Sequence, residues 1–375
     1  MIRQAFYGVN GEPVQHKDGY YGREAEYDEQ GRKTVVTYLG SDGKPTTIAD
    51  GYATFKSSYD ARGNEVRETF HGPNGVPVLS KEKGHHGWEK EAKYDENGKT
   101  IFNLTTYIGP TVIADGYAMV LSSYDKRGNV TRQTFYGING EPVQFKKDGY
   151  YGWTANYDEH NNSTAITYLD QNEKPMAGVD GYAVFKSSYD QRGNKTRETY
   201  YGPNDEPVLS KKEAYHGWEA EYDEQGNQTV ITYLGLDDKP TLLPDGYATM
   251  KSMYDEHGKR IRMTFYDING EPALSKENGY YGWAAEYDEQ GNTTVSTFLG
   301  KDGKPMPGDD GYAIMKFAYD SRGRVTQGTY YDANGEAVKS KKNGYYGWEA
   351  NYDEHGNKTV TYFGKDGKPV DAKQR

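Results

Sequence analysis

The stretch GWEAEYDEQGN, at residues 217–227, decides the fold of this chain. Its first residues alternate, with glutamates between Trp218, Ala220 and Tyr222. Successive side chains of a β-strand point to opposite faces of a sheet, so this alternation predicts a strand with one aromatic face and one acidic face. We therefore assign tryptophan, alanine and tyrosine to the buried face, and the carboxylates to water.

The residues that follow, Asp-Glu-Gln-Gly, predict a tight turn. Aspartate at the first turn position can hydrogen-bond the backbone ahead of it, and glycine at the fourth can take the left-handed conformation that a type I turn with a bulge requires. Ten of eleven copies keep this glycine, and the other has Asn161, a residue type that tolerates the same conformation. A second aromatic strand follows each turn, so each copy is predicted to be a β-hairpin. The eleven Tyr-Asp copies begin at Tyr27, Tyr59, Tyr94, Tyr124, Tyr157, Tyr189, Tyr222, Tyr254, Tyr287, Tyr319 and Tyr352.

Two kinds of hairpin alternate, and together they form a repeat of 65 residues. The first kind carries a tryptophan shortly before its tyrosine, and the second carries Gly-Tyr-Ala there. A fixed period of this kind is the sequence signature of a repeat architecture. The sixth copy of the first kind has Arg23 at the tryptophan position. The five tryptophans are Trp88, Trp153, Trp218, Trp283 and Trp348.

The register of each hairpin follows if the two residues that flank the turn are paired, as Asp223 with Asn227. This pairing predicts Trp218 opposite Thr232, an aromatic residue facing a β-branched one, and Gly217 opposite Tyr233. The equivalent predictions are Trp153 with Thr167, Trp283 with Thr297, Trp88 with Thr106, Gly152 with Tyr168 and Gly87 with Tyr107, and in the second kind of hairpin Lys56 with Glu68 and Lys186 with Glu198.

One irregular hairpin supports the strand assignment. Two extra residues lie between Trp88 and Tyr94, two more lie between Tyr94 and Tyr107, and the connection to Asp115 is four residues shorter. Lengthening both arms of a hairpin by two residues keeps every side chain on its own face, because the strand period is two. A helix has no reason to accept insertions in matched pairs.

We therefore predict an all-β fold, a tandem β-hairpin array of eleven hairpins in an elongated or superhelical, solenoid-like form. A lone hairpin is barely stable, so neighbours must share their aromatic faces. The whole chain, 1–375, is expected to be one continuous array, and neither end has an atypical capping unit, so we expect a segment of a longer array with further copies of the repeat. The expected parts are a partial unit at 1–18, double repeats at 19–83, 84–148, 149–213, 214–278 and 279–343, and a final hairpin at 344–375.

Composition excludes several classes of function. The chain has no cysteine, so it has no disulfide, thiolate metal site or cysteine nucleophile. Its net charge of −11 argues against binding the phosphate backbone of a nucleic acid. Apolar runs are too short to span a membrane, so no membrane insertion is expected.

No catalytic, metal or cofactor site is predicted, because almost every polar residue recurs at equivalent positions. His85 and His86 replace tyrosines of the next copy, which we interpret as aromatic replacement rather than metal ligation. The turn acids, such as Asp223, are explained by turn chemistry and lack the ligand spacing of a calcium loop.

The repeated Gly-Tyr-Tyr-Gly-Trp clusters are the candidate ligand-binding residues. Two consecutive tyrosines in a strand point to opposite faces, so one of each pair could stack on a sugar or contact a protein, and the alternative is that both rings pack between hairpins. Any such site would be multivalent. The candidates are Tyr150, Tyr151, Trp153, Tyr280, Tyr281, Trp283, Tyr345, Tyr346 and Trp348, with Trp88 and Trp218.

The recurrent Tyr-Asp-x-x-Gly-Asn before a second aromatic strand resembles the YD-type repeats of bacterial RHS proteins. That resemblance implies β-hairpin arrays in large secreted or surface proteins, and an extracellular or cell-surface location. The aromatic, glycine-rich hairpins, as at residues 287–292, are also similar in style to glucan- and choline-binding cell-wall repeats.

These observations favour a non-enzymatic scaffold or interaction segment of a larger bacterial protein. The alternative is a multivalent carbohydrate-binding module, for cell-wall glycan or glucan, that uses the repeated tyrosines and tryptophans. The expected partners are a protein or a glycan, and exposure of the five tryptophans separates the two hypotheses.

Overall fold

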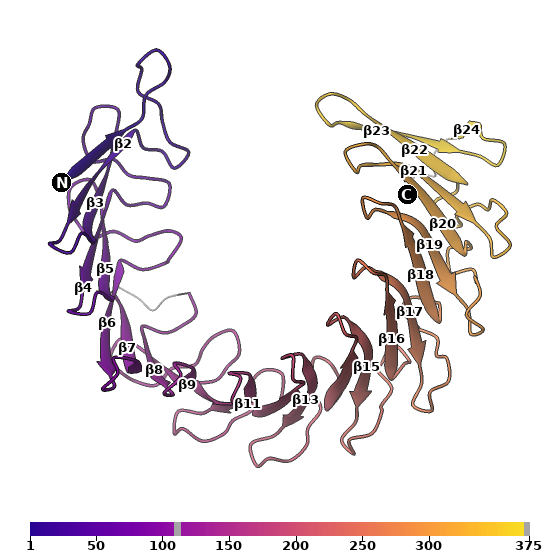
Figure 1. Ribbon diagram of the computed structural model, residues 1–375, viewed down its shortest axis with the longest axis horizontal. Helices are drawn as coiled ribbons and strands as arrows, with labels where there is room; N and C mark the ends of the chain where they lie inside the picture. The colour runs from indigo at the N-terminus through magenta and orange to yellow at the C-terminus, as the bar shows by residue number, and fades with distance from the viewer. Residues whose placement is uncertain (109–113, 371–375) are drawn as a thin grey trace. The chain divides into compact units, whose positions relative to one another are not determined.

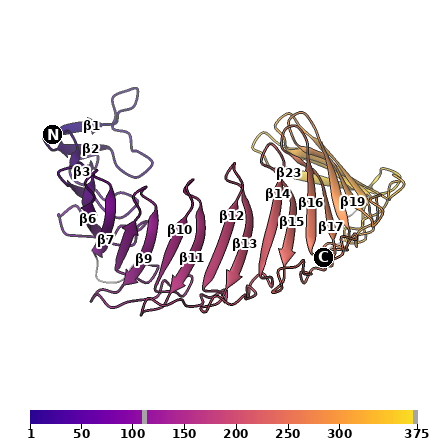
Figure 2. The same ribbon diagram turned by 60° about the horizontal axis from the view of Figure 1, so that its bottom comes forward.

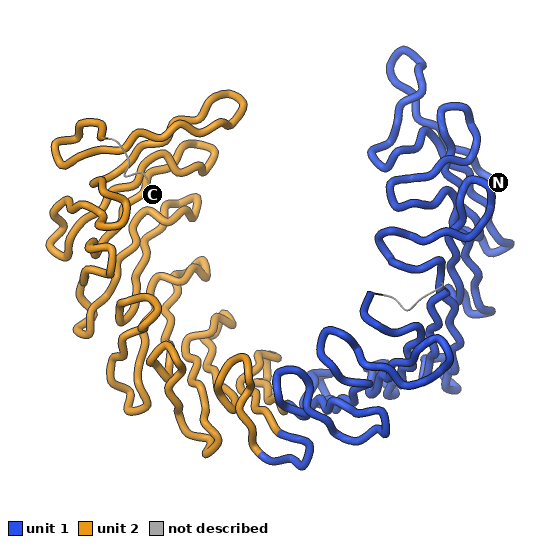
Figure 3. Tube along the Cα trace, turned by 180° about the vertical axis from the view of Figure 1, so that it is seen from behind, with its two compact units in different colours: residues 1–185, 202–206 blue, residues 186–201, 207–375 orange. Residues whose placement is uncertain are grey.

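The computed structural model describes residues 1–108 and 114–370, and these form 24 β-strands and no helix. The predicted all-β tandem hairpin array is confirmed (Figure 1). The chain divides into two compact units, which are described separately (Figure 3). Unit 1 comprises residues 1–185 with 202–206, and unit 2 comprises residues 186–201 with 207–375.

Unit 1 contains eleven complete strands, and β12 (Val184–Tyr189) is divided between the units. The complete strands are β1 (Ile2–Ala5), β2 (Gly22–Tyr27), β3 (Lys33–Leu39), β4 (Thr54–Tyr59), β5 (Glu65–His71), β6 (Gly87–Tyr94), β7 (Thr100–Ile108), β8 (Met119–Tyr124), β9 (Val130–Tyr136), β10 (Gly152–Tyr157) and β11 (Ser163–Leu169).

Unit 2 continues the same pattern. Its strands are β13 (Lys195–Tyr201), β14 (Gly217–Tyr222), β15 (Gln228–Leu234), β16 (Thr249–Tyr254), β17 (Arg260–Tyr266), β18 (Gly282–Tyr287), β19 (Thr293–Leu299), β20 (Ile314–Tyr319), β21 (Val325–Tyr331), β22 (Gly347–Tyr352), β23 (Lys358–Phe363) and β24 (Pro369–Val370).

Within each unit, consecutive strands pair antiparallel and form a meander. The ladder inside a hairpin is long: β14 and β15 are paired from Gly217 to Tyr222. The ladder between hairpins is short: β13 and β14 are paired only over Arg197–Thr199. In both units the Tyr-Asp turns lie along one edge of the sheet, the hairpin tips, and the longer connections lie along the other (Figure 2).

The Tyr-Asp turns have the predicted geometry. In each of the eleven, the aspartate N–H donates to the carbonyl four residues later, as Asp223 does to Asn227 at 3.0 Å. The fourth turn residue donates back to the aspartate carbonyl and has a positive φ, which is 85° at Gly226 and 69° at Asn161. The Asp223 carboxylate also accepts hydrogen bonds from the backbone and side-chain amides of Asn227. This pair of bonds gives a physical reason for asparagine after the glycine.

The predicted register is wrong by one residue wherever a β-bulge lies next to the turn, as between Glu221 and Tyr222 in β14. The last hairpin, β22 with β23, pairs without a bulge, so there the register counted from the turn holds and Trp348 lies opposite Tyr362. The bulge adds one residue to the returning strand, so Trp218 lies opposite Tyr233 rather than Thr232, and Gly217 lies opposite Leu234. The other corrected pairs are Trp153 with Tyr168, Trp283 with Phe298, Trp88 with Tyr107, Gly152 with Leu169 and Gly87 with Ile108.

The same shift corrects the second kind of hairpin. Lys56 lies opposite Thr69, and Ser57 is the residue opposite Glu68. The predicted Lys56–Glu68 ion pair is therefore not formed, because the two side chains point to opposite faces of the sheet. In unit 2, the amine of Lys186 instead lies 4.1 Å from the ring centroid of Tyr201.

The irregular hairpin has the predicted form. Strand β6 has 8 residues where its equivalent β14 has 6, and β7 has 9 where β15 has 7. The pairing continues from Gly87 to Tyr94, so both arms are extended together. The shortened connection that follows lies partly outside the described residues.

The core lies on one face of the sheet, which we call the ring face. It bears Trp218, Ala220 and Tyr222 of β14 and their equivalents, and Ala220 is buried. The opposite face, the polar face, bears Glu219 and Glu221, which are exposed. In unit 1 the connections cover part of the ring face, where Val143 and Met176 pack on the buried cluster of Val120, Phe135 and Tyr150.

Candidate functional site

The first tyrosine of each Gly-Tyr-Tyr-Gly-Trp cluster is packed between neighbouring rings. The centroid of Tyr150 lies 4.4 Å from that of Tyr168, with 9° between the ring planes. The same contact recurs in unit 2, between Tyr280 and Phe298 at 4.8 Å and between Tyr345 and Tyr362 at 4.5 Å. The packing hypothesis is therefore correct for the first ring of the pair.

These contacts form a continuous row of rings in each unit, which we call the aromatic spine. In unit 1 it contains Phe6, Tyr20, Tyr38, Tyr52, Phe70, His85, Tyr107, Tyr117, Phe135, Tyr150, Tyr168 and Tyr182. In unit 2 it contains Tyr200, Tyr215, Tyr233, Tyr247, Phe265, Tyr280, Phe298, Tyr312, Tyr330, Tyr345 and Tyr362. Such ring pairs contribute about 0.5–1.5 kcal/mol each beyond their burial. The spine thus links every hairpin to the next within its unit.

Burial within the spine raises the pKa of several of its tyrosines. Burial and the nearby carboxylate of Asp148 raise the pKa of Tyr150 to about 12. Burial also raises the pKa of Tyr168 and Tyr233 well above the usual value, with neighbouring spine tyrosines adding to the effect. These hydroxyls are poor general bases at neutral pH, and their role is structural.

The second residue of the pair lies on the polar face. The His216 ring contacts Tyr201 edge-on, with 5.2 Å between centroids and 88° between planes, and Tyr201 belongs to that face. Tyr346 lines a groove with Thr329 and Tyr331, which lie on the same face. The predicted division of consecutive rings between two faces therefore holds at residues 215–216 and 345–346.

The tryptophans lie on the ring face and are half-buried. Trp218 faces Tyr233 inside its hairpin and Glu198 of the preceding one. Trp348 lies over Gly328. A Cβ atom added at Gly328 would be only 2.5 Å from the Nε1 atom of Trp348. The tryptophans thus pack on the preceding hairpin and keep part of their surface exposed.

The glycine before each tryptophan is needed for close approach of two strands. A Cβ atom at Gly217 would lie 2.3 Å from the carbonyl oxygen of Glu198 and 2.7 Å from the Cγ2 atom of Thr199. Neither contact is possible without separating β13 from β14. The glycine therefore allows the short ladder between hairpins to form.

The tyrosine of Tyr-Asp connects neighbouring hairpins near their tips. Its hydroxyl donates a hydrogen bond to a backbone carbonyl at the start of the second strand of the preceding hairpin. At this point the short ladder between the two hairpins has already ended. The donors with such bonds, of 2.8–3.0 Å, are Tyr59, Tyr157, Tyr222, Tyr254, Tyr287, Tyr319 and Tyr352. In the extended hairpin, Tyr94 instead donates to the carboxylate of Asp60 at 2.6 Å.

The connections are joined by a polar contact that sequence reasoning missed, which we call the Asp–Ser clamp. The Asp245 carboxylate accepts hydrogen bonds from the hydroxyl of Ser275 at 2.7 Å and from the backbone of Glu277 at 2.6 Å. Ser275 is fully buried. Equivalent clamps join Asp50 to Ser80 and Asp310 to Ser340. Only the recurrence of Asp-Gly-Tyr and Ser-Lys could have indicated this contact.

The described residues contain no group of three or more histidine or acidic side chains placed to hold a metal ion. His160, His257 and His355 lie at exposed turns, each beside a glutamate. No helix long and apolar enough to cross a membrane occurs in the part of the chain that the structure describes.

The chain aligns at low identity with parts of solved Tc toxin structures. No protein-family model and no curated protein match the chain. Among solved structures, the chain aligns with TcdB2-TccC3-TEV at 12% identity over 92% of its length and 19% of that chain, with a TM-score of 0.26. With the Photorhabdus luminescens Tc holotoxin pore, the identity is 13% over 94% of this chain and 18% of that chain, and the TM-score is 0.26. With TcdB2-TccC3, the identity is 14% over 92% of this chain and 19% of that chain, and the TM-score is 0.25. The chain spans about a fifth of the length of these matched chains.

Proposed function

We propose that this chain is a non-enzymatic scaffold and interaction segment of a larger bacterial protein. The observation that carries the proposal is the recurrence of its polar contacts. The turn carboxylates make the same internal hydrogen bond in every Tyr-Asp turn, the Tyr-Asp hydroxyls do so in seven hairpins, and the Asp–Ser clamp recurs at three connections. A scaffold needs such repeated structural bonds, whereas a catalyst needs a unique group of reactive side chains. The location at a cell surface or outside the cell rests on the resemblance to YD-type repeats.

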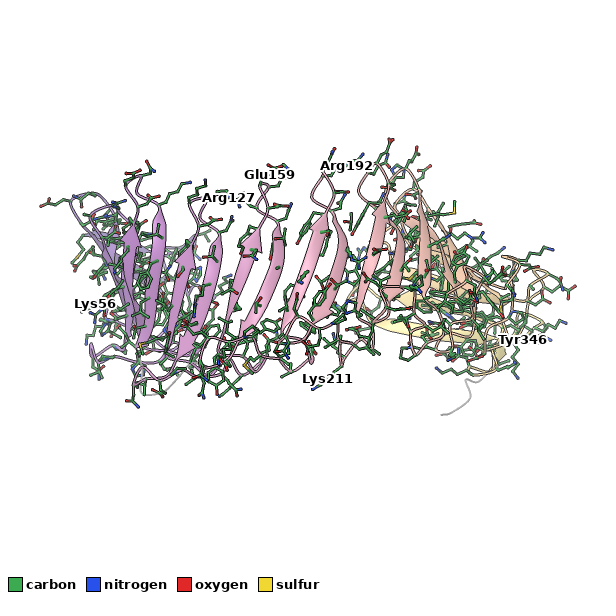
Figure 4. All side chains as sticks on the ribbon, turned by 90° about the horizontal axis from the view of Figure 1, so that it is seen from below. Lys56, Arg127, Glu159, Arg192, Lys211 and Tyr346 are labelled. Atoms are coloured by element: carbon green, nitrogen blue, oxygen red, sulfur yellow. The ribbon has the colours of Figure 1, made fainter. Side chains whose placement is uncertain are left out.

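The tips of neighbouring hairpins are also joined by hydrogen bonds, which is the kind of contact that a scaffold needs. In unit 2, Arg192 donates to the carbonyl oxygens of Asp223 and Glu224 of the next hairpin, at 3.1 and 2.5 Å. In unit 1, Arg127 donates to the Asp158 carbonyl oxygen. Figure 4 shows Arg127 at a hairpin tip of unit 1, and in unit 2 it shows Arg192 at a tip and Lys211 among the connections. Contacts at both edges hold successive hairpins in a fixed order.

The partner surface of the scaffold is the edge formed by the connections. Apolar side chains recur there at equivalent turn positions, and Ile138 is 57% and Ile268 51% exposed. Repeated exposed side chains of this type suit a partner that binds several repeats at once, because linked weak sites gain affinity by avidity.

A photo-crosslinking experiment in producing cells tests the scaffold. A crosslinking amino acid replaces Ile138 or Ile268 in separate variants, with Arg127 at a tip as the control position. We expect the same partner to be captured from both isoleucine positions. Capture from neither position, or an enzymatic activity that maps to residues of a single repeat, contradicts the proposal.

The second candidate function is multivalent carbohydrate binding, favoured by the half-exposed tryptophans. Acrylamide quenching of tryptophan fluorescence, followed by a titration with cell-wall glycan and glucan, tests it. This function predicts accessible tryptophans whose emission changes with glycan, with several sites per chain. Shielded tryptophans that do not respond to glycan would exclude it.

A further inference from the structure

One groove on the polar face of unit 2 differs from its equivalents. It lies between the connections at 331–337 and 363–367 and has a volume of about 260 Å³. Its polar lining includes Gln327 and Glu349, which are paired across β21 and β22. The aromatic residues of its lining are Tyr331, Tyr346 and Phe363, together with Trp348.

In other repeats an arginine occupies the Gln327 position and crosses the groove. Arg132 pairs with Glu173 in unit 1, and in unit 2 Arg197 pairs with Asp238. Arg262 donates to the Gly303 carbonyl oxygen at 3.5 Å. Each of these arginines reaches from the sheet to the next connection and fills the space between them.

The groove at Arg3 shows the effect of the arginine on volume. It is lined by equivalent residues, including Tyr7, Tyr21 and Leu39, and its volume is only about 70 Å³. The Arg3 guanidinium lies against Gly43 of the next connection. Glutamine is shorter and uncharged, so the Gln327 groove stays open.

The loss of the arginine also leaves a carboxylate available. Glu24 lies 3.4 Å from Arg3 and Glu89 lies 3.6 Å from Arg67, at the positions equivalent to Glu349. Among the described residues, Glu349 makes no ion pair, and it is exposed. Its oxygens can therefore accept hydrogen bonds from a ligand.

Two rings of the groove are suited to stacking. The Lys316 amine lies 5.0 Å from the Tyr331 centroid and takes one face of that ring. Tyr346 and Phe363 are half-buried, and neither has a ring neighbour in the described part of the chain. Phe363 is itself unusual, because this position is leucine in other copies, at Leu39, Leu169, Leu234 and Leu299.

We propose that this groove binds one ring of a neutral sugar. The apolar face of a pyranose stacks on an aromatic ring, and its hydroxyls can donate to a carboxylate and exchange hydrogen bonds with a primary amide. The volume is slightly below the ~300–1,000 Å³ of sites for drug-sized ligands, so one sugar ring fits better than a long segment. The lining carries one carboxylate, Glu349, and one amine, Lys365, so the groove has no net charge and suits a neutral ligand. This inference goes beyond the scaffold function, and a failure to bind sugar would leave the scaffold proposal unchanged.

The full chain is titrated with glucose, galactose and N-acetylglucosamine, with binding followed by saturation-transfer NMR and by calorimetry. The expected result is saturable binding of at least one of them at one site per chain. Gln327→Arg installs the residue that other repeats carry, so it should keep the parent melting temperature and weaken binding at least tenfold. Phe363→Leu, which also copies other repeats, should weaken binding in the same direction.

A variant that copies the groove residues into another repeat provides a second test of the proposal. The triple variant Arg262→Gln, Ala284→Glu and Leu299→Phe copies the groove into the preceding repeat, which already has Tyr281. We expect two sites per chain in this variant. No binding of the three sugars, binding unchanged in Gln327→Arg, or about five equivalent sites in the parent chain would each overturn the proposal.

Discussion

The hydroxyl of Tyr222 donates a 2.8 Å hydrogen bond to the carbonyl oxygen of Lys195 in the preceding hairpin. The two strands are no longer paired at this point, because the ladder between β13 and β14 covers only Arg197–Thr199. Tyrosine in the Tyr-Asp motif therefore has a role that phenylalanine cannot fill: it connects the parts of two hairpins that the backbone leaves apart.

Replacing Tyr222 by phenylalanine should lower the free energy of unfolding by about 0.5–1.5 kcal/mol, the usual net value of one hydrogen bond. Chemical denaturation followed by circular dichroism measures the change. Tyr27→Phe is the matched control, since the Tyr27 hydroxyl has no hydrogen-bond partner among the described residues and the ring is exposed. An equal effect of both variants would contradict the role of the hydroxyl.

Gly217→Ala should destabilise unit 2 by about 1–3 kcal/mol, the usual cost of forcing extra volume into a packed site. The added methyl group meets the Glu198 carbonyl, which is part of the backbone and cannot rotate away. Gly300→Ala is the control, because its nearest atom to an added Cβ is 3.4 Å away. Thermal unfolding compares the two, and a neutral Gly217→Ala would show that the strands are not held this close.

Ser275→Ala should cost about 1.5–3 kcal/mol, because it removes the hydrogen bond from the buried Ser275 hydroxyl to the charged, partly buried Asp245 carboxylate. The Ser275 hydroxyl also accepts from the backbone of Asn278 at 3.1 Å, and that bond is lost too. Hydrogen exchange at Asn278 and Glu277 should increase. The exposed Ser321→Ala variant should leave stability and exchange unchanged.

The chain should lose stability at alkaline pH. Several spine tyrosines have raised pKa values in the folded state, among them Tyr150 at about 12 and Tyr168 and Tyr233, whereas the unfolded value is about 10. The folded state therefore disfavours the phenolate, and its stability is complete below about pH 10 and falls as the pH rises through the folded pKa values. Denaturation midpoints measured across this range test the effect. Tyr233→Phe should make the decline shallower, and an unchanged midpoint throughout would contradict the burial of these hydroxyls.

The hairpins and their faces could be predicted because their signals are local. Alternation around Trp218, Ala220 and Tyr222 fixes the strand, and the residues from Asp223 to Gly226 fix the turn. The register could not be read correctly because the bulge next to Tyr222 adds one residue to the ladder. A bulge changes neither the composition nor the alternation of the outgoing strand, so counting from the turn gives the wrong partner.

The candidate site was only partly predictable. The sequence shows that two consecutive tyrosines, such as Tyr345 and Tyr346, must separate, but not which of them stays accessible. The Gln327 groove brings together β21, β22 and two connections, so its form depends on packing between segments that are far apart in the sequence. The one readable signal was the replacement, in a single repeat, of the arginine that other repeats carry.

The contrast between long ladders inside hairpins and short ladders between them has a mechanical consequence. A pull applied along a unit would act first on the junctions between hairpins, as between β13 and β14, where only three residue pairs form the ladder and the tyrosine hydroxyl, the tip arginine and the ring contacts supply the rest. Each hairpin, with its longer internal ladder, would still be paired when the ladder to its neighbour had separated. Such a unit would lengthen in small, equal steps under load, and it would shorten again as each junction closed.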